Sequence, residues 1–139
     1  MGLTGTMSIL AFQPDAGRYY AEGYWRPGDL WSGFAASASR TPAKDALIVG
    51  QRQISYAGLE RAAVTLSGRL AEHSIGPGDI VLLLGRNGIE AAIALLACFH
   101  RGAVAAPLPP MFGAQQLAAL AGQAGARAVI SFGGATAPR

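Results

Sequence analysis

The sequence is poor in charged residues and in cysteine. Acids and bases make up 14% of the 139 residues, whereas 51% are hydrophobic; a typical soluble domain is roughly 25% charged. A chain of this composition has much apolar surface to bury, and its length allows at most one modest domain. The single cysteine, Cys98, excludes an internal disulfide and any metal site built from several cysteines. Because Cys98 lies in an apolar stretch, we expect it to be buried.

Long apolar runs and clustered basic residues are also missing. The longest apolar run, residues 91–99, is too short to cross a bilayer, and the N-terminus lacks the basic and apolar regions of a secretory signal. The net charge of +3 comes from eleven basic residues against eight acids, which are dispersed along the chain. Nucleic-acid binding needs a clustered basic face, so this charge does not favour that class. We expect a cytoplasmic protein without a membrane span.

Sequence motifs that would indicate a particular reaction are absent as well. There is no phosphate loop of the form Gly-x-x-x-x-Gly-Lys-Ser/Thr, and no Gly-x-Gly-x-x-Gly at a strand-to-helix turn. The Gly-x-Ser-x-Gly of a nucleophile elbow is missing too. The two histidines do not form a site: His73 is expected near a helix end, and His100 does not share a helical face with Cys98. The sequence therefore predicts no catalytic, cofactor-binding or metal-ligating residue.

What is present is a regular succession of helix and strand patterns. Asp29 predicts the start of a helix over residues 30–40, whose core stripe would be Leu30, Phe34 and Ala38. Residues 46–49 and 53–55 flank a glycine-containing turn, which predicts a short hairpin.

The second half of the chain continues in the same way. Ser55 is expected to cap a helix, and Gly76 suits the position just past its end. Pro77-Gly78 fits the centre of a type II turn, because proline fixes φ and glycine takes a positive φ. The patterns that follow predict strands at 80–84, 103–106 and 128–131 and helices at 87–99 and 115–124.

The alternation of strands and helices predicts an α/β fold. Two successive βαβ units would form a partial parallel sheet flanked by helices. Seven of the eleven aromatic residues lie in the first 34 positions, and we expect these rings to pin an N-terminal arm across the surface; an aromatic binding platform is the alternative. We divide the chain into this arm (1–28), a partial α/β subdomain (29–132) and a tail (133–139) that looks like a cut end.

Two loops are candidates for binding, because ligands of open α/β sheets lie beyond the carboxyl ends of the strands. Residues 85–88 lead into a helix N-terminus that could attract an anion; an Asn87 N-cap flanked by glycines is the alternative. Residues 107–113 are apolar and rich in proline, so a stiff connector packed on the sheet is the alternative there. Neither loop carries a nucleophile, a carboxylate pair or a metal constellation.

Four segments in one order carry a family resemblance. They are Arg18-Tyr19-Tyr20-Ala21-Glu22-Gly23-Tyr24-Trp25, then Ile54-Ser55-Tyr56-Ala57-Gly58-Leu59, then Gly76-Pro77-Gly78-Asp79-Ile80 with Asn87 and Glu90 in register, and finally Phe99 to Pro110. Together they resemble the opening of the adenylate-forming (AMP-dependent) synthetase/ligase family, of the acyl- and aryl-CoA synthetase type. The first segment is similar to dihydroxybenzoate–AMP ligases and cyclohexanecarboxylate–CoA ligases. Gly58 departs from the family's usual glutamate, and Arg86 from a common proline.

The resemblance implies the first part of the large N-terminal domain of such an enzyme. Family members use ATP and Mg²⁺ to convert a carboxylic acid into an acyl-adenylate, and usually pass the acyl group to coenzyme A or a carrier thiol. Their Ser/Thr/Gly-rich loop ending in Pro-Lys-Gly and their adenylation lysine match nothing here. No catalytic residue is carried over, and we expect the fragment to be inactive alone and to bind none of these cofactors.

Two other functions stay open. The chain is alternatively a non-catalytic α/β interaction module that binds a partner chain, or a second copy of itself, through an exposed edge of its incomplete sheet. A third alternative is a complete small nucleotide-binding α/β domain, which the missing phosphate motifs disfavour.

Overall fold

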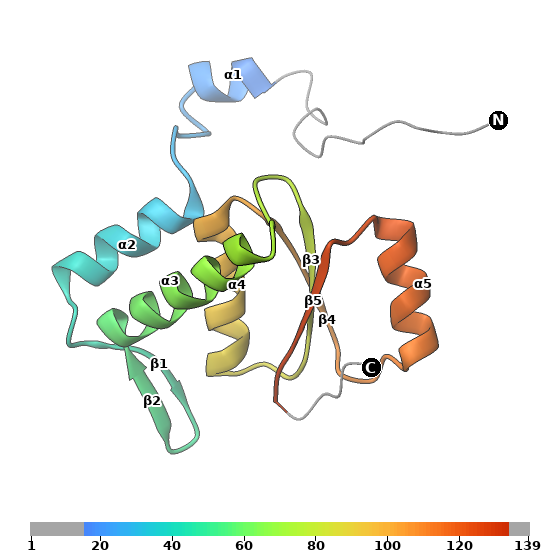
Figure 1. Ribbon diagram of the computed structural model, residues 1–139. Coiled ribbons are helices and arrows are strands. Elements are labelled where there is room, and N and C mark those ends of the chain that lie inside the picture. The colour runs from blue at the N-terminus through green and yellow to red at the C-terminus, as the bar shows by residue number, and fades with distance from the viewer. Residues whose placement is uncertain (1–15, 134–139) are drawn as a thin grey trace.

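The computed structural model describes residues 16–133, so Phe12 of the aromatic arm lies outside the described part of the chain. The elements are α1 (Ala16–Ala21), α2 (Leu30–Arg40), β1 (Asp45–Val49), β2 (Arg52–Ser55), α3 (Tyr56–Glu72), β3 (Ile80–Leu84), α4 (Ile89–Arg101), β4 (Val104–Leu108), α5 (Ala114–Ala124) and β5 (Ala128–Ser131). Figure 1 shows helices on both sides of the three-stranded sheet. The predicted α/β fold with a parallel sheet is confirmed.

The sheet has the order β4-β3-β5, with the first of its strands in the centre. From β3 the chain passes through α4 to β4 on one side, and then through α5 to β5 on the other side. Helices α4 and α5 lie on opposite faces (Figure 1). The winding direction therefore reverses at β3, which is the arrangement that leaves a crevice at the carboxyl ends of the strands.

Strand β3 divides the hydrophobic core into two parts. Val81 and Leu83 pack against α3 and α4, while Leu82 and Leu84 pack against Leu117 of α5. These four residues of β3 are at most 2% exposed, as expected for a parallel strand covered on both faces. Because successive side chains of β3 point to opposite faces of the sheet, this one strand packs against both helical layers.

The N-terminal caps of α2 and α3 are those that the sequence predicts. The Asp29 carboxylate accepts a hydrogen bond from the Ser32 N–H at 2.6 Å, and this bond holds the pKa of Asp29 below its usual value. The Ser55 hydroxyl accepts one from the Gly58 N–H at 3.2 Å. These bonds satisfy N–H groups that have no partner inside the helix.

Helix α3 ends differently from the prediction. Ser74, not Gly76, adopts the left-handed conformation, with a φ of +59°. The Ile75 N–H donates to the Leu70 carbonyl at 2.9 Å, which is the bond of a Schellman motif. Ile75 and Leu70 are both buried in the same cluster, so an apolar contact stabilises the turn in place of the predicted glycine.

Gly76 has another role, in the turn that leads into β3. Its N–H donates to the Asp79 carboxylate at 2.8 Å, and the Asp79 N–H donates to the Gly76 carbonyl at 3.2 Å. Gly78 has a φ of +82°. The predicted type II turn with Pro77-Gly78 at its centre is therefore confirmed.

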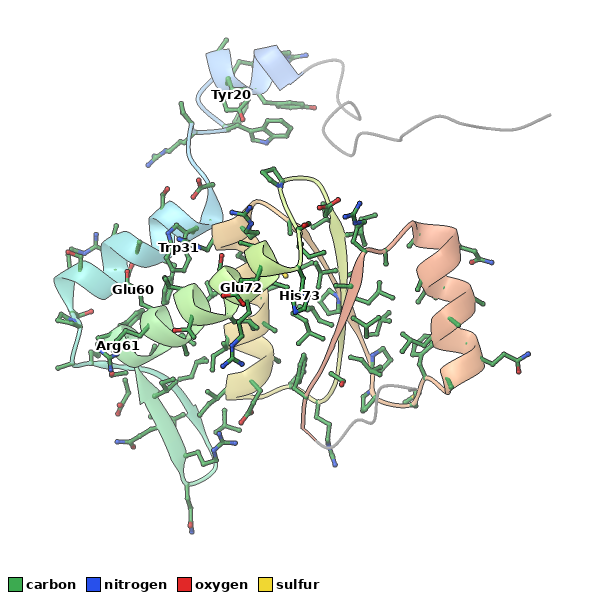
Figure 2. The ribbon with its side chains drawn as sticks, viewed as in Figure 1. Tyr20, Trp31, Glu60, Arg61, Glu72 and His73 are labelled. Carbon is green, nitrogen blue, oxygen red and sulfur yellow. The ribbon has the colours of Figure 1, made fainter. Side chains whose placement is uncertain are left out.

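The aromatic arm does not lie across the surface of the body, and that prediction is wrong for the described residues. Gly23, with a φ of +76°, folds the chain back. The ring of Trp25 then packs on Tyr19 at 5.0 Å and on Tyr20 at 5.6 Å between centroids. Tyr24 is 74% exposed. Figures 1 and 2 show α1, with Tyr20, standing apart from the other helices. The rings pack on one another because the turn brings them together.

Helix α2 is fixed to the body by its aromatic side chains. Trp31 lies with its ring 4.5 Å from that of His100 on α4, and Phe34 lies 6.0 Å from Tyr56 on α3. The predicted core position of Leu30 is wrong, since Leu30 is 69% exposed. In the first turn of α2, Trp31 and not Leu30 faces the body of the protein.

The predicted hairpin is confirmed as β1 and β2, which pair antiparallel and project from the body (Figure 1). Gly50 turns the chain with a φ of +62°. The guanidinium of Arg52 forms an ion pair of 2.6 Å with Glu90 at the start of α4. This pair links the hairpin to the helix that follows β3.

Candidate functional site

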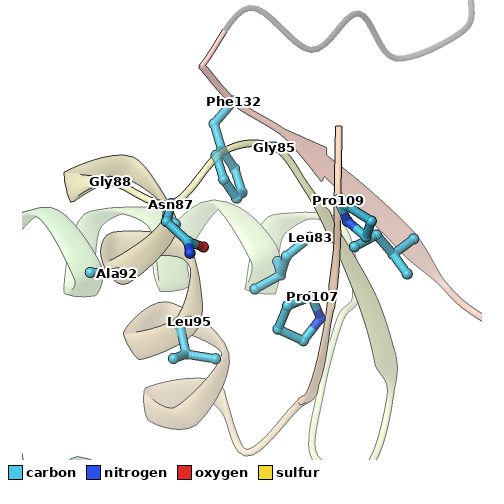
Figure 3. A pocket seen from close by; sticks show the side chains of 11 residues that line it. Leu83, Gly85, Asn87, Gly88, Ala92, Leu95, Pro107, Pro109 and Phe132 are labelled. Atoms are coloured by element: carbon cyan, nitrogen blue, oxygen red, sulfur yellow. The ribbon is translucent and has the colours of Figure 1, made fainter. Parts of the chain in front are cut away.

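The two candidate loops meet at one cavity. It has a volume of about 370 Å³ and lies between α4 and the carboxyl ends of β3 and β4 (Figure 3). The first loop contributes Gly85, Asn87 and Gly88, and the second contributes Pro107, Leu108 and Pro109. Its size is at the lower end of the roughly 300–1,000 Å³ common for ligand sites. The cavity lies at the edge where an open α/β sheet binds its ligands.

Gly85 is required here because the end of β5 comes very close. A Cβ atom on Gly85 would overlap the Phe132 ring and would lie 2.6 Å from the Phe132 carbonyl oxygen. The Phe132 N–H donates to the Leu84 carbonyl at 3.0 Å and holds this approach. Figure 3 shows the Phe132 ring beside Gly85 at the cavity. Sequence reasoning missed Phe132, because no local pattern shows which strand lies beside β3.

The start of α4 does not have the predicted Asn87 cap. Gly88 occupies the N-cap position, and no side chain caps the helix. The Glu90 carboxylate lies in the first turn, where bonds from Arg52 and from its own backbone N–H hold its pKa below the usual value. An anion at this helix end would meet a carboxylate already in place, so the structure does not support an anion site there.

The side chains that line the cavity are almost all apolar. Leu83, Leu95, Pro107 and Phe132 supply apolar walls, and the Asn87 amide is the one polar side-chain group among the lining residues. In Figure 3, Asn87, Leu95 and Pro107 border the same space. Such a site can hold an apolar group and orient it by hydrogen bonds to the Asn87 amide. None of its lining side chains can transfer a proton or act as a nucleophile.

Two further apolar residues of the second loop, Met111 and Phe112, differ in their surroundings. Phe112 packs against the core cluster on the α5 side of the sheet, as expected for a connector that packs on the sheet. Met111 is 81% exposed and does not follow that expectation.

Elsewhere, the described residues hold few reactive groups. Cys98 is 0% exposed, and burial raises the pKa of its thiol to about 11, so the thiol is protonated at neutral pH. Its predicted burial is confirmed. Within residues 16–133, no three His, Cys, Asp or Glu side chains are grouped closely enough to hold a metal ion. None of the helices in that range has both the length and the apolarity needed to cross a membrane.

Comparisons with known proteins place these features in a family. Residues 34–138 match the family described as AMP-binding enzyme. Tyrocidine synthase 3 of Brevibacillus parabrevis is 32% identical over 89 residues, which are 64% of this chain and 1% of that protein. A medium/long-chain-fatty-acid–CoA/3-oxocholest-4-en-26-oate–CoA ligase of Mycobacterium marinum is 43% identical over 63 residues, which are 45% of this chain and 12% of that protein.

Among solved structures, Klebsiella oxytoca NpsA in complex with 3-hydroxyanthranilyl-AMSN is similar in fold. The TM-score is 0.71 and the identity 28%, over 82% of this chain and 23% of the NpsA chain. The present chain thus spans a small part of the length of each relative. The family match covers both loops of the cavity and all three strands of the parallel sheet. On these grounds the chain belongs to the family of AMP-binding, adenylate-forming enzymes.

Proposed function

We propose that this chain is the N-terminal part of an ATP-dependent carboxylic acid–CoA ligase and is inactive alone. In that reaction the acid and ATP form an acyl-adenylate, and coenzyme A then takes the acyl group as a thioester. The observation that carries the proposal is the family match over residues 34–138. Mg²⁺ would accompany the ATP, as the family resemblance implies. The use of ATP and coenzyme A favours a cytoplasmic location.

Different relatives support the proposed acid substrate and the proposed acceptor of the acyl group. NpsA has been captured with 3-hydroxyanthranilyl-AMSN, which supports a carboxylic acid as the activated group. The Mycobacterium marinum relative, 43% identical over 63 residues, is named as an acid–CoA ligase, and this name supports coenzyme A as the acceptor.

Within such an enzyme, this chain would supply scaffold and not reacting groups. Its cavity has no ionisable side chain among the lining residues. The chain also corresponds to 23% of the NpsA chain, so most of the residues of the relative have no counterpart here. Residues 29–132 would form the partial subdomain, with the arm before it. Family membership does not favour the alternative of an independent interaction module.

The coding DNA downstream of Arg139 tests this proposal. We expect it to continue in frame and to encode a Ser/Thr/Gly-rich loop that ends in Pro-Lys-Gly. The longer polypeptide should then form a thioester from a carboxylic acid, ATP and coenzyme A, detected by mass spectrometry. A matched reaction with a carrier protein in place of coenzyme A distinguishes the two acceptors. A reading frame that closes without such a loop would contradict the proposal.

A further inference from the structure

We draw no further inference here: the strongest candidate, the apolar cavity between α4 and the carboxyl ends of β3 and β4, belongs to the site already described, and nothing among residues 16–133 shows which ligand or segment fills it.

Discussion

Among single residues, Gly85 determines how closely β5 approaches β3 at the cavity. Its importance does not come from a special φ angle, but from the space that a side chain would occupy. Phe132 already fills that space with its ring and its carbonyl oxygen. The cavity wall and the packing of β5 against β3 therefore both depend on the absence of a side chain at Gly85.

Gly85→Ala should destabilise the chain by about 1–3 kcal/mol, the usual cost of overpacking a close contact. Gly88→Ala is the matched control, because the nearest atom to a Cβ there is the Glu90 carboxylate oxygen at 3.4 Å. Urea unfolding of both variants measures the difference. Equal stability of the two would show that β5 does not approach Gly85 as described.

Glycines inside α3 lead to a second residue-scale prediction. Gly68 is exposed, and a Cβ atom added to it would have no other atom within 4 Å. Gly68→Ala should therefore stabilise the chain by about 0.5–1 kcal/mol through helix propensity. At Gly58 a Cβ would lie 3.1 Å from Ile54 Cγ1, so Gly58→Ala should raise the stability of the chain by less than Gly68→Ala does. Thermal unfolding compares the two, and a larger gain at Gly58 would contradict this view of the helix start.

At the scale of elements, α2 is held at its start by a charged cap. The bond from the Ser32 N–H to Asp29 lowers the pKa of Asp29 from its usual 3.8 in the folded chain. A lowered folded-state pKa contributes stability above the unfolded value, and this contribution is lost as the pH falls through the folded value. Asp29 therefore stabilises α2 at neutral pH and ceases to do so in acid.

Asp29→Asn separates this charge from the hydrogen bond, because an asparagine oxygen can still accept from Ser32 but does not titrate near this pH. We expect wild type to be the more stable at pH 6, and the difference to shrink below about pH 3.8. Urea midpoints followed by circular dichroism across this range give the result. A constant difference from about pH 6 to about pH 2 would show that the charge of Asp29 has no part in it.

The elements that the sequence predicts are those with local signals. Ser55, Asp29 and Pro77-Gly78 act on backbone groups within three residues, so the caps and the turn can be read directly. Helix α3 ends at Ser74 because Ile75 finds a place in the core. That contact depends on the packing of the whole layer, which explains why local reasoning predicts a glycine there instead.

Strand order and the cavity belong to the whole molecule, and for that reason the sequence alone does not predict them. The position of β5 beside β3 depends on which face α5 covers. Without that order, the position of Phe132 at the cavity could not be predicted. The carboxyl-edge loops could be named in advance, since parallel strands always bring such loops to one side.

As a whole, the described residues form a scaffold with an apolar cavity, and the family to which the chain belongs performs its chemistry on ATP and an acid. The central claim is that this chain does not carry the reacting groups. The most direct test is ATP–pyrophosphate exchange by the purified 139-residue chain with a panel of aryl, alicyclic and fatty acids. We predict no exchange above the control without acid. Exchange that depends on the added acid would contradict the account.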